Sequence, residues 1–171
     1  VTIDLNKKTV TGADGAVVFN IKADATIKNG TILGNKSGTS SGLIDIYANL
    51  AMDSVTLETS KINALSFKKG DCTATLDSCN ITGAFKGYGG SVWAINSGTY
   101  KAASTSINDQ LNGTAQISGG TFHYAITDEE CAPGYSVVNN GDGTYTVKYA
   151  PVCFVDTNNN GTLDEGETVY G

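Results

Sequence analysis

A six-residue phrase returns six times between Leu5 and Phe122. It reads LNKKTV, IKNGTI, MDSVTL, LDSCNI, INSGTY and ISGGTF, starting at residues 5, 27, 52, 76, 95 and 117. The steps between these starts are 22, 25, 24, 19 and 22 residues. A repeat at this spacing is the signature of a solenoid, because each unit buries its apolar face only by stacking on the next one. The phrase therefore predicts one elongated domain of stacked units.

The content of each unit predicts strands rather than helices. Short runs rich in β-branched and aromatic residues precede the phrase in three units: AVVFNI (16–21), LIDIYA (43–48) and ALSF (64–67). A strand–turn–strand unit of about 22 residues is too short for a βαβ crossover, which needs about 30, and fits one coil of a parallel β-helix. We expect an all-β, parallel β-helix of about six coils over residues 1–126. A β-sandwich is the alternative fold, because evenly spaced short strands also suit it.

The six copies of the phrase predict which side chains face the interior. Position one is apolar in every copy (Leu5, Ile27, Met52, Leu76, Ile95 and Ile117), and so is position six (Val10, Ile32, Leu57, Ile81, Tyr100 and Phe122). Position five holds Thr9, Thr31, Thr56, Asn80, Thr99 and Thr121, which alternate with position six and should face solvent. Like positions of neighbouring coils stack about 4.8 Å apart, so six coils would make a rod about 29 Å long.

This repeat pattern resembles the right-handed parallel β-helix of the pectate-lyase-like group over about residues 1–126, without any catalytic signature of that group. The phrase SGGTF followed by GYSVVNNGDGTYTVK is also similar to segments of large bacterial surface proteins that carry such repeats. The resemblance implies a protein of the bacterial cell surface or the extracellular space.

Residues 127–153 predict a β-hairpin instead of a further coil. TDEECAPG interrupts the repeat with acids, proline and glycine, and the alternating runs YSVVNN and TYTVKY then flank GDG, centred on Asp142. Cys131 and Cys153 lie 11 residues on either side of Asp142, opposite each other in an antiparallel pair. We therefore predict a disulfide bridge and an oxidising, extracellular setting, with two free buried thiols as the alternative. Cys72 and Cys79 fit small packing positions, although spacing alone leaves a bridge across the coil open.

The strongest chemical motif is DTNNNGTLDEGE, residues 156–167, within the predicted tail of residues 154–171. It matches an EF-hand calcium loop, in which oxygen ligands at alternate positions converge around a tight turn at the sixth residue. The predicted ligands are Asp156, Asn158, Asn160, the carbonyl of Thr162, Asp164 directly or through water, and bidentate Glu167. Without flanking helices or a second loop, the motif is similar to the single calcium loops of bacterial extracellular proteins. It predicts a structural Ca²⁺ site of modest affinity.

Position two of the phrase places two carboxylates on neighbouring coils. The column reads Asn6, Lys28, Asp53, Asp77, Asn96 and Ser118. Asp53 and Asp77 should therefore lie about 5 Å apart, where carboxylates can share a proton, bind calcium or hydrolyse a glycoside. The simpler interpretation is a surface ladder in which Lys28 neutralises Asp53. Polysaccharide lyases and hydrolases on the fold that the chain resembles usually add Arg, His or more carboxylates. This chain has no Arg and one histidine, so Asp53 and Asp77 are weak catalytic candidates and an enzyme is the minority hypothesis.

Charge and hydropathy argue against two classes of partner. The 11 basic residues are all Lys, and the formal charge of −6 leaves no clustered positive face for nucleic acid. No apolar run approaches the roughly 18 residues of a membrane span, so we expect no membrane insertion.

The first repeat begins directly as a strand, in which Val1, Ile3 and Leu5 alternate with polar residues. Solenoid ends need caps, so we expect this edge to be covered by another copy or by an adjacent domain of a longer surface protein. The expected function is an extracellular structural module of a surface fibre, stalk or filament, stacked end to end, with calcium stabilising the C-terminal junction. The alternative is a carbohydrate-binding or polysaccharide-degrading β-helix domain with a glycan as its ligand.

Overall fold

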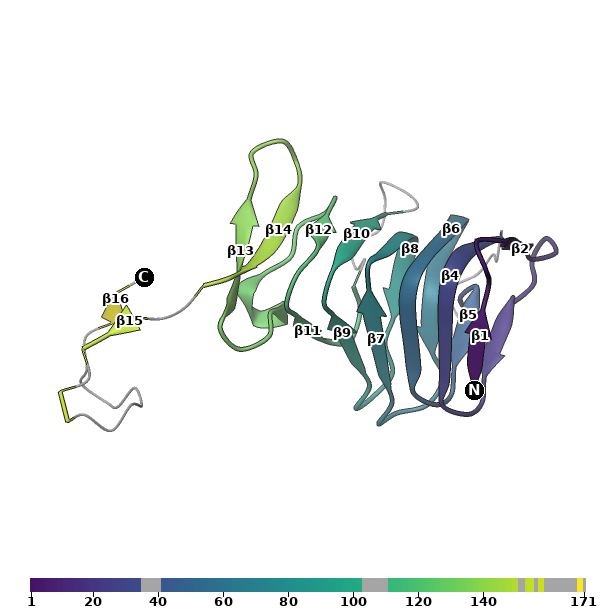
Figure 1. Cartoon of the computed structure of the whole chain (residues 1–171), viewed down its shortest axis with the longest axis horizontal. Helices are drawn as coiled ribbons and strands as arrows, with labels where there is room; N and C mark the ends of the chain where they lie inside the picture. Colours follow the sequence, from purple (N-terminus) through teal and green to yellow (C-terminus); the bar gives the residue numbers. More distant parts are fainter. Residues whose placement is uncertain (35–40, 103–110, 151–152, 156, 159–168, 171) are drawn as a thin grey trace.

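The computed structural model describes residues 1–34, 41–102, 111–150, 153–155, 157–158 and 169–170, with no account of the side chains of residues 60–62, 153–154 and 169–170. Its strands wind into a parallel β-solenoid of about five turns, which confirms the predicted fold class. The first coil lies at one end of the solenoid and a β-hairpin lies at the other (Figure 1). Within the described residues, no helix is long and apolar enough to cross a membrane.

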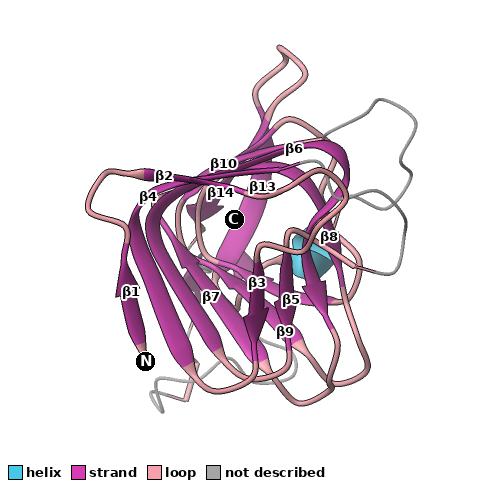
Figure 2. Cartoon of the chain, turned by 90° about the vertical axis from the view of Figure 1, so that its right-hand side faces the viewer, coloured by secondary structure: helices cyan, strands magenta, loops and turns pink. Residues whose placement is uncertain are grey.

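Three faces of stacked strands surround the interior (Figure 2). Face A contains β1 (Thr2–Asp4), the starts of β4 (Ala25–Gly34) and β6 (Leu50–Phe67), β7 (Thr73–Asp77), β9 (Val92–Ile95) and β11 (Thr114–Ile117). Face B contains β2 (Thr9–Thr11), the later parts of β4 and β6, β8 (Cys79–Lys86), β10 (Gly98–Lys101) and β12 (Thr121–Phe122). Face C contains β3 (Phe19–Ile21), β5 (Ile44–Ile46), the ends of β6 and β8, and a bridge at Leu111.

The columns predicted for face B are in register throughout. Thr9, Thr31, Thr56, Asn80, Thr99 and Thr121 are successive partners, so six stacked strands are separated by five turns. The neighbouring apolar column is at most 1% exposed from Ile32 to Phe122. Alternation between a buried and an outward rank is what a strand packed on one side requires.

The first coil differs from the prediction on face A. Ile3, and not Leu5, is the register partner of Ile27. The rest of the predicted column is correct: Met52, Leu76, Ile95 and Ile117 follow in register and are buried. The first coil therefore contains two more residues between face A and face B than the other coils do.

A tight turn accounts for those two residues. Asn6 and Lys7 both have positive φ angles, 48° and 60°, and the N–H of Lys8 donates to the carbonyl of Leu5 at 2.8 Å. Positive φ at both central positions is the type I′ turn. The turn lets Leu5 lie over Gly30, where an added Cβ would sit 2.4 Å from the Cβ of Leu5. Leu5 therefore still fills the interior, although it leaves the ladder.

Aromatic side chains fill the later coils. Trp93 is fully buried, and its ring centroid lies 4.1 Å from that of Phe67 and 5.0 Å from that of Phe85. Its indole N–H donates to the carbonyl of Asn112 at 2.9 Å. Gly113 leaves room for the indole, because a Cβ there would lie 3.3 Å from Nε1 of Trp93. Trp93 therefore points into the interior of the solenoid.

The predicted hairpin closes the opposite end. β13 (Tyr135–Asn139) pairs with β14 (Tyr145–Tyr149) in a register centred on Asp142. β14 also pairs antiparallel with β12, so the hairpin continues face B, and Val147 is buried against the core. A short 3₁₀ turn, η1 (Asp128–Glu130), precedes the hairpin, and β15 (Cys153–Phe154) pairs with β16 (Val169–Tyr170) in a separate ladder.

Candidate functional site

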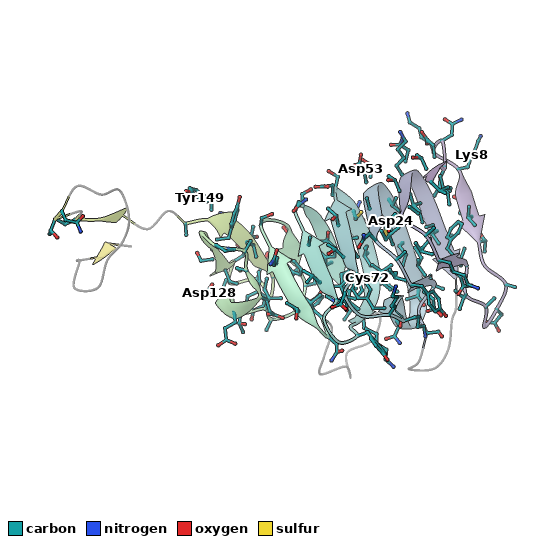
Figure 3. The ribbon with its side chains drawn as sticks, turned by 90° about the horizontal axis from the view of Figure 1, so that it is seen from below. Lys8, Asp24, Asp53, Cys72, Asp128 and Tyr149 are labelled. Carbon is teal, nitrogen blue, oxygen red and sulfur yellow. The ribbon has the colours of Figure 1, made fainter. Side chains whose placement is uncertain are left out.

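The two predicted carboxylates lie on adjacent strands of face A. Asp53 and Asp77 are register partners, and Asp53 lies on the outside of the solenoid (Figure 3). Asp53 is exposed and accepts a hydrogen bond from the Ser54 hydroxyl at 2.8 Å, while Asp77 is half-buried. The adjacency predicted from the repeat is therefore present.

The cation of this column does not pair as we expected. Lys28 is the register partner of Asp53, but its ammonium lies 3.6 Å from a carboxylate oxygen of Asp4 on the other side. Asp4 also accepts from the Asn6 N–H at 2.9 Å and from the Asn29 side chain at 3.3 Å. These donors, the Asn6 N–H first, hold the pKa of Asp4 below its usual range. Asp4 was missed because the shifted first coil puts it, rather than Asn6, in this column.

This column is a solvent-facing ladder of charged side chains and does not resemble a metal centre. Among the described residues, no three His, Cys, Asp or Glu side chains come close enough to hold a metal ion. The one histidine of the chain, His123, is exposed and lies beyond β12, away from Asp53 and Asp77. The pair can accept hydrogen bonds from a ligand.

The N-terminal end of the solenoid has an unpaired edge. Within the described residues, β1 and β2 each pair only with β4, and β3 pairs only with β5. Leu5 in the turn is buried, but the inward side chains on the three strands of this coil are only half-buried. Their partners in the second coil are fully buried: Ile3 against Ile27, Val10 against Ile32, and Phe19 against Ile44. Both backbone groups and apolar side chains are therefore open at this end.

The outer edge of β2 presents backbone N–H groups that do not bond to β4. Lys8 and Gly12 flank β2; the Lys8 carbonyl accepts from the Thr31 N–H, and the Gly12 N–H donates to the Leu33 carbonyl, so the even-numbered positions bond toward β4. The ladder of a parallel pair alternates, and the N–H groups of Thr9 and Thr11 consequently point away from β4. These two groups are available to a further strand.

On the C-terminal edge strand, β13, two outward N–H groups are already occupied. The Asp128 carboxylate accepts from the Val137 N–H on the outer edge of β13 at 2.7 Å, and the Tyr135 N–H donates to Ala132 at 3.0 Å. A carboxylate bonded to an edge strand occupies the donor that another chain would use. Asp128 was not among the predicted site residues. The sequence signal was TDEE from Thr127 to Glu130, a capping-box pattern, and Glu130 does accept from the Thr127 N–H at 2.7 Å.

The predicted disulfide is not formed, because Cys131 carries a free thiol. The side chain of Cys153 lies outside the described residues. The hairpin register would place the two cysteines opposite each other, but β13 begins only at Tyr135. Before it, the chain turns at Gly134, whose φ is 80°, and Cys131 forms a parallel bridge with Ile117 of face A. Cys131 therefore belongs to the solenoid end and not to the hairpin.

Two of the described cysteines, Cys79 and Cys131, have thiols with raised pKa values. Burial, with Asp128 and Glu130 nearby, raises the pKa of Cys131 above its usual value. Cys72 and Cys79 are also free and buried, so the open question of a bridge between them is answered in the negative. Burial raises the pKa of Cys79 to about 11. A thiol with a raised pKa carries little thiolate near neutral pH, so Cys79 and Cys131 are poor nucleophiles.

The predicted calcium loop, residues 156–167, lies almost wholly outside the described residues. Of its predicted ligands only Asn158 is described, and it is exposed. The ligand set Asp156, Asn158, Asn160, Thr162, Asp164 and Glu167 therefore stays a prediction from the sequence.

No family model, no curated protein and no solved structure matches the chain. Its function must be argued from its own geometry, in which the first coil has an unpaired edge and the last coil is covered by a hairpin.

Proposed function

We propose that this chain is a structural module of an extracellular fibre, stalk or filament, joined to its neighbour through its first coil. The observation that carries this proposal is the open N-terminal edge. Unpaired strand edges template the addition of another strand, and half-buried apolar side chains gain free energy when a further coil covers them. The solenoid needs this cover, because each coil is stabilised mainly by its neighbours.

The covering element is another β-solenoid coil, from a preceding part of the same polypeptide or from a second copy. A coil matches all three faces at once, whereas a single strand would match one. The Asp128 contact supports a polarity in the assembly, because β13 does not offer the Val137 N–H to a partner. The tail, residues 154–171, would therefore form the contacts on the C-terminal side of a junction.

We further propose that Ca²⁺ binds the loop at residues 156–167 and orders this tail. The support is the donor set, which combines carboxylate, amide and carbonyl oxygens at the spacing that calcium requires. Calcium would supply a multivalent charge that draws the acidic ligands together. A location outside the cell now rests on this loop and on the surface-protein resemblance, since Cys131 is free.

Sedimentation velocity tests the edge-pairing proposal. Thr11→Pro removes one outward N–H of β2, and proline is tolerated on an edge strand where its N–H side faces away from the ladder. Thr11→Ala is the matched control, because it shortens the side chain and keeps the N–H. We expect association of the native chain and of Thr11→Ala at high concentration, and a monomer for Thr11→Pro with unchanged circular dichroism.

The same experiment with calcium and with a chelator separates the two ends. A native chain that stays monomeric in both conditions would reject association between copies and would leave pairing with a coil of the same polypeptide. Equal association of all three proteins would place the interface away from β2. Loss of association with chelator alone would assign the junction to the tail.

A carbohydrate-degrading activity is the second candidate, favoured by the register of Asp53 with Asp77. A reducing-sugar assay on acidic polysaccharides tests it. Activity that disappears in both Asp53→Asn and Asp77→Asn would support an enzyme. No activity in the native chain would remove the candidate.

A further inference from the structure

A separate hollow lies where face C turns into face A, away from the open end. It has a volume of about 340 Å³ and lies between two successive turns of the solenoid. One turn supplies Gly87, Tyr88, Gly89 and Gly90, and the next supplies Asn112, Gly113 and Thr114. The size is at the lower end of small-molecule sites, which span about 300–1,000 Å³.

Tyr88 is the exposed aromatic residue of this hollow, with 59% of its surface accessible. Its backbone is held firmly: its N–H donates to the hydroxyl of Ser91 at 3.0 Å, and its carbonyl accepts from the Ser91 N–H at 2.9 Å. Gly90, with φ of 74°, completes the turn, and Ser91 itself is buried. A large apolar ring is therefore presented to solvent from a rigid base, which lowers the entropy cost of binding.

The floor of the hollow is backbone rather than side chain. A Cβ on Gly87 would lie 2.5 Å from the carbonyl oxygen of Asn112, so the two turns touch directly. Asn112 and Thr114 are exposed and add an amide and a hydroxyl. Among the described residues, no charged side chain lines the hollow. The hollow therefore suits a neutral ligand with one apolar face and several hydroxyl or amide groups.

We propose that this hollow binds a single ring of a neutral carbohydrate, stacked on Tyr88. The C–H face of a pyranose is apolar and packs on an aromatic ring, while its hydroxyl groups bond to amides, hydroxyls and backbone groups at the rim. This site is independent of the first coil and of the calcium loop. It would give a structural module a means of holding glycan.

Trp93 supplies a local reporter for the site. It is the one tryptophan of the chain, it lies beneath the hollow, and its indole N–H bonds to the carbonyl of Asn112. A ligand in the hollow contacts the same turn from outside. Titration of the full chain with neutral mono- and oligosaccharides of glucose, galactose, mannose and N-acetylglucosamine should shift the indole N–H resonance saturably. A single ring should bind with a Kd of about 1 mM.

Three variants make the test specific. Tyr88→Ala should weaken binding about tenfold, which is the loss of about 1.4 kcal/mol of stacking, and Tyr88→Phe should bind as the native chain does. Tyr149→Ala is the matched control, because Tyr149 is also an exposed tyrosine, 66% accessible, but lies on the hairpin. Circular dichroism confirms the fold of each variant.

The proposal is overturned if no neutral sugar shifts the Trp93 signal. It is also overturned if Tyr149→Ala weakens binding as much as Tyr88→Ala, or if only acidic glycans or peptides bind.

Discussion

At the scale of single residues, the corner between faces A and B depends on a left-handed backbone. Asn29, Ser54 and Ser78 have φ angles of 57°, 56° and 50° at this corner. L-residues other than glycine and asparagine adopt this region at a cost of about 1–2 kcal/mol each. Asn29 suits the position, whereas the two serines hold it because the strands on both sides are fixed by pairing. The coil therefore stores strain at defined points.

Ser54→Gly should release part of this strain. Glycine adopts positive φ freely but loses more chain entropy on folding, so the expected net gain in the free energy of unfolding is about 0.5–1 kcal/mol. Urea unfolding followed by circular dichroism measures it. Thr56→Gly, two residues further along in the strand, is the matched control and should lose about 0.5–1 kcal/mol. A Ser54→Gly protein less stable than the native chain would refute the role of backbone strain here.

Asp4 should give the first coil a pH dependence. The pKa of Asp4 is depressed in the folded chain by the Asn6 N–H, by Asn29 and by Lys28. The stabilisation is therefore present above the ordinary carboxyl pKa and is lost as the pH falls through the lower folded value. Asp4→Asn removes this term. Its melting temperature should decline less steeply than that of the native chain as the pH falls from about 5 to about 2.

Asp14→Asn is the control for that measurement, because Asp14 is an exposed carboxylate of the same coil. It should follow the native curve. Parallel curves for the native chain and for Asp4→Asn would show that the contacts of Asp4 contribute nothing.

At the scale of elements, η1 protects the last strand of the sheet. Asp128→Ala frees the Val137 N–H and should lower stability by about 0.5–1.5 kcal/mol, the usual net contribution of one hydrogen bond. It should also raise self-association, because an edge strand without its carboxylate can pair with another chain. Glu129→Ala, in the same turn and exposed, is the control for the change in charge. Equal association of the two variants would attribute the effect to charge alone.

The regular coils could be predicted from the sequence because five copies of the phrase turn the same corner with the same number of residues. The register of the first coil could not be predicted. The type I′ turn at Asn6 and Lys7 leaves the apolar pattern of LNKKTV the same as that of the other copies. That shift also hid Asp4 as the partner of Lys28. The adjacency of Asp53 and Asp77, which lies beyond the shift, was predicted correctly.

The C-terminal elements show the same limit. The turn sequence GDG gave the hairpin register correctly, since glycine and aspartate on a hairpin tip are a local signal. The disulfide prediction extended that register past Pro133 and Gly134, where the chain makes a type II turn. Whether Cys131 continues the hairpin or returns to Ile117 is a tertiary choice that spacing does not encode. The residue that Cys131 pairs with, Ile117, lies 14 residues earlier in the chain.

At the scale of the whole molecule, the two ends of the solenoid differ in whether another element packs on them. The last coil packs against Val147 of the hairpin, which is 4% exposed, and the first coil packs on one side only. The stability of a solenoid is approximately a sum of coil terms and nearest-neighbour terms. The coil with one neighbour should open most often, and local opening is what hydrogen exchange measures.

Amide exchange should therefore be graded along the axis. We expect the fastest exchange in β1 and β2, strong protection in β6 and β8, and protection maintained in β12 because β14 covers it. Peptide-resolved exchange with mass spectrometry checks this order on dilute, monomeric chain. When the concentration is raised until copies associate, protection of β1 and β2 should rise to that of β4 if another coil covers them. An associated sample whose first coil still exchanges rapidly would show that the interface lies elsewhere, and edge pairing would have to be abandoned.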